Sequence, residues 1–239
     1  MNFTEQQIQK AIKRTYPSYI NNLRDRNTAL KKDCFIRGTL AEIFFKDLFQ
    51  QYGFIMQSNV TNNGEDIDLQ ISGIILLHQT ILFDNPLNIE IKTSLIPYQG
   101  FDILKSADLK IYQKSNNIEC DINWHIGIQV YFNKFKKDWE NFIEQSDNTA
   151  ICNGYKNLNF SCSWITRDRT IEYLNSIPIN NRTWSFQGSY KTFWHCPLNI
   201  HNHNIYEMII HLLHLLIHQQ QIHINNLNTY ITQIKGGNV

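Results

Sequence analysis

Two helical patterns open the chain. Thr4 followed by Gln7 forms a capping-box pattern, and isoleucines four residues apart mark one face of the helix that begins there. Pro17 ends this pattern, because a proline interrupts helical hydrogen bonding. A second helix is expected over residues 38–52, where apolar side chains recur three and four positions apart. Gly53 then stands where a C-terminal cap is expected.

Alternating apolar and polar residues predict strands after these helices, because side chains two apart in a strand share a face. The alternation is found at 54–60, 66–77, 87–96 and 124–132. The sequence DNP is expected to form a turn before the third strand, and helices are expected at 101–114 and 136–145. The order helix, three strands, helix, strand predicts a mixed α/β core.

The pattern weakens after about residue 148. Residues 163–178 are expected to form a strand end followed by a helix, and the aromatic-rich segment 183–198 a strand or a loop. Residues 204–221 are long and apolar enough for a helix. Because no repeat and no clean linker occurs, we expect one domain over residues 1–239.

Composition places the chain among ordinary globular proteins. With 239 residues, of which 42% are hydrophobic and 13% aromatic, the chain can bury a sizeable core. The amino terminus has no apolar signal segment, and the apolar run at 208–217 is too short for a membrane span. Five scattered cysteines without a CxxC pair indicate reduced thiols. We therefore expect a cytoplasmic protein without a membrane partner.

Charged residues gather on one face of the second and third predicted strands. Asp66 and Asp68 share a face, and so do Glu90 and Lys92, while isoleucine and leucine fill the opposite side. If the strands are neighbours, three carboxylates converge, and their repulsion costs several kcal/mol unless positive charge lies among them. Lys92 supplies one charge. A hard divalent cation such as Mg²⁺ or Mn²⁺ would supply the rest, because carboxylate and water oxygens are its natural ligands.

A cation held in this way favours hydrolysis of a phosphodiester. It polarises a phosphoryl oxygen and lowers the pKa of a bound water, while Lys92 orients that water or stabilises the developing charge. Glu42, which interrupts the apolar string LAEIFF in the second helix, is a further candidate ligand. The alternative for Glu42 is an ion pair with Lys46, four residues along the same helix.

These residues resemble the PD-(D/E)XK nuclease superfamily, which includes type II restriction endonucleases. The resemblance covers residues 36–132 and rests on Glu42, Asp68, Glu90 and Lys92 in that order. It implies a restriction-endonuclease-like α/β core, in which helices flank a four-stranded mixed sheet, with an elaborated C-terminal region. It also implies Mg²⁺-dependent cleavage of double-stranded DNA and a homodimer. A glutamate replaces the proline of the motif, and we favour Asp68 over Asp66 as the ligand because it falls at the IDL step.

Candidate DNA-binding residues lie near the end of the predicted core and beyond it. Lysines at the end of the last core strand are suited to phosphate contacts, and arginines among aromatic residues are suited to base edges. These candidates are Lys134, Lys136, Arg167, Arg169, Arg182 and Lys191. Each of them also fits an ordinary solvated or loop-anchoring role. Zinc is an alternative cofactor for the histidine-rich part, through His195, Cys196, His201, His203, His211, His214 and His218.

The leading hypothesis is a Mg²⁺-dependent restriction endonuclease. Asp68 and Glu90 would bind the metal, assisted by Glu42 or Asp66. The core would span about 36–145, and residues 146–239 would supply DNA recognition and dimer contacts. Two alternatives stay open: a structure-specific resolvase or repair nuclease, and a DNA-binding module that has kept the fold but lost catalysis.

Overall fold

The computed structural model describes residues 2–14, 27–62, 65–76, 79–185, 191–220 and 232. Its helices are α1 (Glu5–Lys13), α2 (Thr28–Gln51), α3 (Ile103–Ser106), α4 (Ile118–Asp121), α5 (Lys136–Gln145), α6 (Asn148–Lys156), α7 (Arg167–Ser176) and α8 (Ile205–Gln220). Its strands are β1 (Phe54–Asn62), β2 (Glu65–Leu76), β3 (Gln79–Ile96), β4 (Ile111–Tyr112), β5 (Ile126–Phe135), β6 (Phe160–Thr166), β7 (Thr183–Ser185) and β8 (Thr192–Trp194).

The larger of the described sheets has five strands in the order β1-β2-β3-β5-β6. Strands β1, β2 and β3 are antiparallel neighbours, β5 runs parallel to β3, and β6 runs antiparallel to β5. A parallel neighbour needs a crossover connection, which the residues between β3 and β5 supply. The expected mixed α/β core is therefore confirmed, with one strand more than the four that the resemblance implied.

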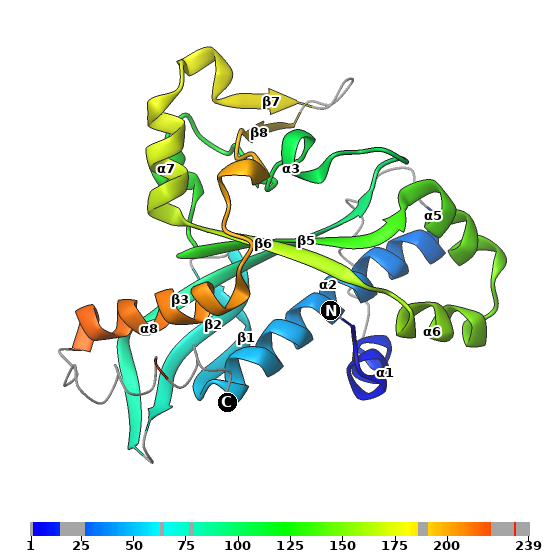
Figure 1. Ribbon diagram of the computed structural model, residues 1–239, viewed down its shortest axis with the longest axis horizontal. Helices are drawn as coiled ribbons and strands as arrows, with labels where there is room; N and C mark the ends of the chain where they lie inside the picture. The colour runs from blue at the N-terminus through cyan, green and yellow to red at the C-terminus, as the bar shows by residue number, and fades with distance from the viewer. Residues whose placement is uncertain are drawn as a thin grey trace.

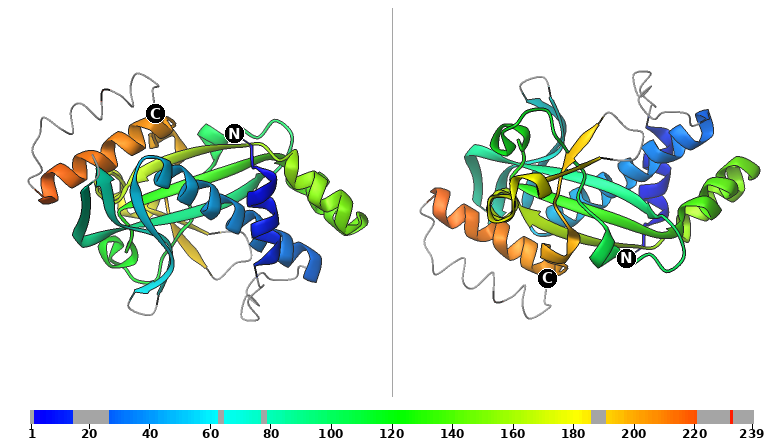
Figure 2. Two further views of the ribbon diagram at one scale, coloured as in Figure 1. Left: turned by 90° about the horizontal axis from the view of Figure 1, so that it is seen from below. Right: turned by 90° about the horizontal axis from the view of Figure 1, so that it is seen from above.

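Helices and a second, smaller sheet cover the two faces of the large sheet. Figure 1 shows α2 and α8 beneath the sheet, with α3, α7, β7 and β8 above it; β7 and β8 belong to a three-stranded sheet in the order β4-β8-β7. Figure 2 shows α2 running across the strands, with α1 over part of it. The lower layer holds the larger apolar core, in which Leu40 and Phe45 of α2, Ile89 of β3 and Leu212 of α8 are completely buried. Apolar burial on both faces keeps the sheet rigid behind any site on it.

The two predicted helices at the start of the chain are present, although the second is longer than expected. In α1 the Thr4 side chain accepts the Gln7 N–H and the Gln7 side chain accepts the Thr4 N–H, so the capping box is confirmed. Helix α2 begins at Thr28 rather than near residue 38, and Asn27 caps it by accepting the N–H of Leu30. The charged residues after Thr28 hid this first part from the apolar pattern.

The expected turn at DNP is wrong, because β3 passes through it. Ile71 pairs with Leu87 but Gly73 pairs with Leu82, so four residues of β3 lie opposite Ser72. This irregularity accommodates Pro86, which has no N–H to contribute to a regular ladder. The strand predicted after DNP is confirmed, the part of β3 before DNP was not predicted, and the proline marks a bulge rather than a chain reversal.

The expected helix at 101–114 is also wrong. Only α3 is helical there, capped by the Asp102 side chain, and the chain then enters β4, which pairs with β8. The other expectations for the later part of the chain are confirmed: a strand and a helix within 163–178, strands in the aromatic-rich segment, and α8. Helix α6 was not predicted. Of the helices that the structure describes, none has both the length and the apolar character to cross a bilayer.

Candidate active site

Strands β2 and β3 separate at the point where the predicted site begins. Their ladder runs as far as Leu69 opposite Ile89. At the next step the Asp68 carboxylate takes the place of a backbone acceptor: its Oδ2 accepts the N–H of Ile91 at 2.7 Å. This bond fixes Asp68 between the two strands. The register also makes Asp68 and Glu90 neighbours, because residues adjacent to a paired position face each other across the strands.

Glu90 and Lys92 lie on the same face of β3, as the strand period requires. The Lys92 ammonium group forms an ion pair with Glu90. The side chains are 38% exposed for Lys92 and 19% for Glu90, so both remain accessible from the solvent side. The opposite face of the strand carries Ile89 and Ile91, which are buried in the core. The predicted division between a charged and an apolar face is therefore confirmed for β3.

Helix α2 brings Glu42 to the same place. Its side chain is 19% exposed, and its Oε2 lies 2.6 Å from Nη1 of Arg14, at the end of α1. The sequence suggested Lys46 as the simple ion-pair partner, whereas the structure gives Glu42 a partner from a different helix. Glu42 is close enough to Glu90 and Lys92 to feel the charge of both. The prediction that the helix contributes a carboxylate to the strand cluster is consistent with this placement.

The carboxylates repel one another and are short of positive charge. Burial raises the pKa of Asp68 to about 7, with a further rise from Glu90 that Lys92 only partly offsets. Burial also raises the pKa of Glu42, although Arg14 opposes the change. Three carboxylates thus share two cationic side chains. A group of this kind gains most from one more positive charge.

Lys92 stays protonated in this environment. Burial by itself lowers its pKa, but attraction to Glu90, Asp68 and Glu42 outweighs burial and raises the pKa above its ordinary value. The side chain therefore presents an ammonium group, which donates hydrogen bonds and does not accept a proton. Its chemical role is to hold an oxygen atom or to stabilise negative charge.

The donor set fits a small hard cation with few protein ligands. Among the described residues, no three acidic, histidine or cysteine side chains are already placed around a common point for a metal ion. Mg²⁺ does not require such a cage, because it keeps several waters and binds through one or two carboxylates. Asp68 and Glu90 are the pair that would hold it, with Glu42 beside them. The side chain of Asp66, the remaining candidate, lies outside the described residues.

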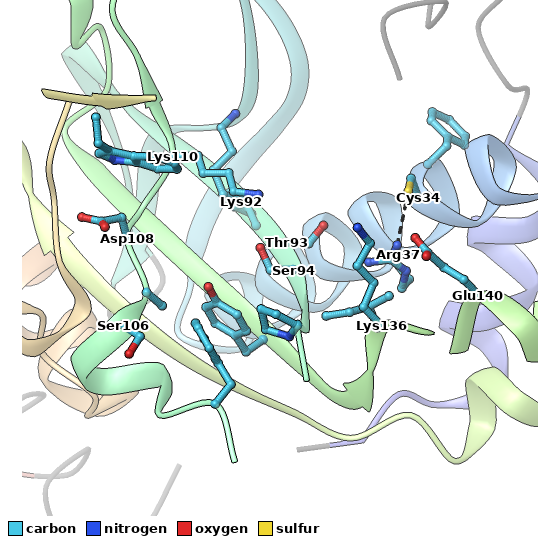
Figure 3. A pocket seen from close by; sticks show the side chains of 18 residues that line it. Cys34, Arg37, Lys92, Thr93, Ser94, Ser106, Asp108, Lys110, Lys136 and Glu140 are labelled. Atoms are coloured by element: carbon cyan, nitrogen blue, oxygen red, sulfur yellow. Dashed lines mark hydrogen bonds between the residues drawn. The ribbon is translucent and has the colours of Figure 1, made fainter. Parts of the chain in front are cut away.

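A cleft of about 840 Å³ opens beside Lys92 (Figure 3). Residues from α2, β3, α5 and the second sheet line it, and they include Arg37, Lys92, Thr93, Ser94, Asp108, Lys110, Lys136 and Trp184. A smaller hollow of about 440 Å³ continues from Lys92 and Lys110 to Glu90. Four cationic side chains therefore reach a space that adjoins the acidic group. An anionic substrate would be attracted to this combination.

The predicted DNA-binding residues fall into separate places. Lys136 lines the cleft, and Lys134 is exposed close by on β5. Lys191 immediately precedes β8 of the second sheet, with its ammonium group 5.3 Å from the centre of the Tyr112 ring. The other three are used locally. Arg167 and Arg182 donate to backbone carbonyls, and Arg169 pairs with Glu172 on an exposed helix surface.

The described histidines do not form the zinc site that was considered. His201 is buried between the Ser163 hydroxyl, 3.1 Å from Nδ1, and the Cys196 thiol, 3.4 Å from Nε2. Burial lowers the pKa of His201 to about 3, which keeps the ring neutral. His211 packs against the ring of Trp164. The side chain of His218 lies outside the described residues.

Two cleft residues were missed by the sequence analysis. Arg37 stands among the charged residues of the segment LKKDCFIR, where basic side chains are usually solvated, yet it is only 4% exposed. Lys110 was assigned to a helix that does not form. Asp108, two residues before Lys110, lies 2.9 Å from Nδ1 of His195, so a contact between the segments next to β4 and β8 fixes this part of the cleft wall. The spacing of Asp33 and Arg37, four residues apart in a helix, was the available signal.

Comparison of the chain with models of protein families, with characterised proteins and with solved structures finds no match.

Proposed function

We propose that this protein is a Mg²⁺-dependent endodeoxyribonuclease of the PD-(D/E)XK type that hydrolyses phosphodiester bonds of double-stranded DNA. The observation that carries the proposal is the grouping of Asp68, Glu90 and Lys92 at the point where β2 and β3 separate, beside Glu42 and a cationic cleft. Repelling carboxylates with a fixed ammonium group beside them are costly to a fold. Their chemistry supports a site that takes up a cation.

The order of elements supports the same proposal. Helix α2 supplies Glu42, β2 supplies Asp68, and β3 supplies Glu90 and Lys92, with β5 parallel to β3 behind them. This is the order of helix and strands on which the sequence resemblance rests. Five strands in place of four do not disturb it, because β6 is added at the edge, away from β2.

Each chain residue has a distinct task in the proposed reaction. When bound, Mg²⁺ supplies Lewis acidity toward the phosphate and lowers the pKa of a coordinated water. Asp68 and Glu90 place the cation, and Asp68 is held in position by the Ile91 N–H. Lys92 orients the attacking water and stabilises the charge that develops on the phosphate oxygens. Mn²⁺ has the same ligand preferences and is expected to replace Mg²⁺.

A restriction enzyme is the form of nuclease that the rest of the chain favours. The second sheet and α8 add a large region beyond the carboxylate-bearing core, and Tyr112, Trp184 and Lys191 of that region face the cleft or lie beside it. Aromatic and basic side chains in such a place are suited to nucleic acid. Cutting both strands of a duplex needs two sites, so the proposed enzyme acts as a homodimer.

The test is the substitution Lys92→Ala, with Lys105→Ala as the matched control. Lys105 has an 84% exposed side chain on α3. The wild-type protein and the control are expected to cleave unmethylated plasmid DNA in Mg²⁺. Lys92→Ala is expected to lose cleavage by at least a hundredfold, while it still binds DNA in Ca²⁺. Equal cleavage by Lys92→Ala and wild type would overturn the proposed mechanism.

The choice of substrate separates the proposed enzyme from its alternatives. Discrete fragments from plain plasmid DNA support a restriction enzyme. Cleavage of branched DNA alone would identify a resolvase or repair nuclease instead. If the wild-type protein binds DNA but cleaves neither substrate in Mg²⁺ or Mn²⁺, the chain is a DNA-binding module without catalysis.

A further inference from the structure

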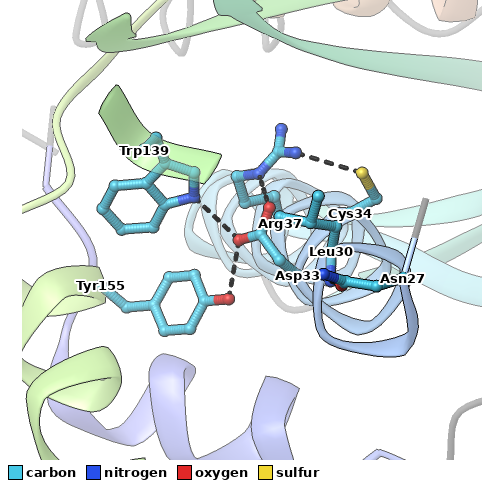
Figure 4. A network of polar contacts seen from close by, with 7 residues as sticks. All are labelled: Asn27, Leu30, Asp33, Cys34, Arg37, Trp139 and Tyr155. Carbon is cyan, nitrogen blue, oxygen red and sulfur yellow. Dashed lines mark hydrogen bonds and ion pairs between the residues drawn. The ribbon is translucent and has the colours of Figure 1, made fainter. Parts of the chain in front are cut away.

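A buried polar network joins α2 to α5 and α6 behind the cleft (Figure 4). Asp33, which is 2% exposed, lies at its centre. Its Oδ1 accepts the Trp139 indole N–H and the Tyr155 hydroxyl, each at 2.9 Å. Its Oδ2 accepts the Nε–H of Arg37, also at 2.9 Å. A buried carboxylate is tolerated when it is satisfied in this way.

The network fixes the guanidinium group of Arg37 in one orientation. Nε is bound to Asp33, Nη2 lies 3.3 Å from Sγ of Cys34, and the ring of Phe132 packs 5.7 Å from the central carbon. Within the part of the chain that the structure describes, Nη1 has no hydrogen-bond partner. Arg37 nevertheless lines the cleft (Figure 3), so a buried guanidinium group with donors left over borders this space.

The need to neutralise the charge of Asp33 does not by itself explain why residue 37 is an arginine. A guanidinium group carries five N–H donors, and the carboxylate uses one of them. Trp139 and Tyr155 already satisfy the other carboxylate oxygen. Arginine is the side chain suited to phosphate, because its planar donors match phosphate oxygens and its rotamer is fixed in advance here.

The amino terminus of α5 lies at the same corner of the cleft. Its N-cap residue, Phe135, makes no side-chain hydrogen bond to the first turn. Lys136 is the first residue of the helix and lines the cleft. Trp139, one turn along, is the residue that binds Asp33, so the network that orients Arg37 also fixes this helix end. Backbone N–H groups and the helix dipole at such an end favour a phosphate oxygen.

We propose that Arg37, Lys136 and the amino-terminal turn of α5 form a binding site for one phosphate of a DNA strand next to the phosphate that is cleaved. This inference rests on the proposed function and adds to it the position of the strand: the backbone runs along the cleft from Lys92 past Thr93 and Ser94 to Arg37. Glu140 also lines this corner, so its carboxylate and that of Asp33 balance the charges of Arg37 and Lys136, and a phosphate would be held by directed N–H donors rather than by excess charge. Arg37 and Lys136 position the DNA and do not take part in the chemical step.

The experiment measures the salt dependence of binding to a duplex in Ca²⁺, where cleavage does not occur. Each phosphate contact contributes about −0.9 to the slope of log K against log salt concentration. Arg37→Gln is expected to reduce the size of this slope by about one and to weaken binding on the order of tenfold at 0.1 M salt. Lys136→Gln removes a surface charge without touching the Asp33 network and is expected to change the slope in the same direction.

Tyr155→Phe is the control for a purely structural role. It removes one bond to Asp33 but leaves both proposed phosphate-binding side chains in place. It is expected to lower the melting temperature and to leave the salt slope unchanged.

The phosphate site is overturned if Lys136→Gln and a folded Arg37→Gln protein both keep the wild-type salt slope. This holds whether or not the wild-type protein cleaves DNA in Mg²⁺. If the wild-type protein binds no duplex at all, the proposed function falls together with the phosphate site. Wild-type cleavage in Mg²⁺ is therefore recorded in parallel, so that the two failures are distinguished.

Discussion

Replacement of Asp68 by asparagine is expected to stabilise the protein and to abolish its activity. The pKa of this carboxyl group rises from its ordinary 3.8 to about 7 because it is buried and lies next to Glu90. A pKa that is raised by folding means that the folded protein binds the proton more tightly than the unfolded chain. The free energy of unfolding of the metal-free protein therefore falls as the pH rises from about 4 to about 7.

The size of the effect follows from the pKa. One pKa unit corresponds to about 1.4 kcal/mol, so the charged carboxylate costs the metal-free protein about 4 kcal/mol above pH 7, as an upper bound. Asparagine cannot ionise, and its side-chain oxygen can still accept the N–H of Ile91. For a chain of this length, about 4 kcal/mol raises the melting temperature by about 10 °C.

The assay is thermal unfolding of the metal-free protein at pH 4 and pH 8. Asp84→Asn is the matched control, because Asp84 is an exposed aspartate on the same strand as Glu90. Asp68→Asn is expected to melt well above wild type at pH 8 and close to it at pH 4, whereas Asp84→Asn is expected to show no such difference. The reasoning is refuted if the melting temperature of Asp68→Asn differs from that of wild type by the same amount at pH 8 as at pH 4, as is expected of Asp84→Asn.

Three further outcomes follow from particular contacts. Gly127→Ala is expected to reduce the free energy of unfolding by about 1–3 kcal/mol, because the added Cβ would lie 2.6 Å from Cδ2 of Leu109. Denaturant unfolding measures this free energy, and an unchanged value would contradict the packing around Gly127. Tyr155→Phe is expected to reduce the free energy of unfolding by about 1–2 kcal/mol, because the hydrogen bond from the Tyr155 hydroxyl to Asp33 is lost. Glu140→Gln is expected to strengthen duplex binding severalfold, measured by fluorescence anisotropy, because it removes a negative charge from the cleft; weaker binding would contradict that assignment.

The part of the site that the sequence predicted depends on local geometry. The strand period of two places Glu90 and Lys92 on one face whatever the rest of the chain does. Ile89 and Ile91, on either side of Glu90, are buried, so the direction in which Glu90 and Lys92 point is also determined by the sequence. The interpretation of DNP as a turn failed because a bulge opposite Ser72 accommodates Pro86 within one strand.

The part that was missed depends on contacts between distant segments. Residues 107–114 have a helical spacing, yet β4 forms there because β8, far along the chain, pairs with it. Arg37 is buried because Trp139 and Tyr155 cover Asp33 from two other helices. A pattern within LKKDCFIR cannot contain that information, and basic residues in a helix are usually exposed. The ion-pair partner of Glu42 could not be predicted for the same reason, because Arg14 lies at the end of a separate helix.

The most direct test of the account is whether Asp68 and Glu90 bind a divalent cation beside Lys92. Mn²⁺ binding is followed by electron paramagnetic resonance in the wild-type protein, in the double variant Asp68→Asn, Glu90→Gln, and in Lys92→Ala. We expect wild type to bind Mn²⁺ in competition with Mg²⁺, and the double variant to lose this binding. Lys92→Ala is expected to bind at least as tightly as wild type, because the ion pair that competes for Glu90 is removed. Equal Mn²⁺ binding by the wild type and the double variant, or no binding by the wild type, would contradict the central claim.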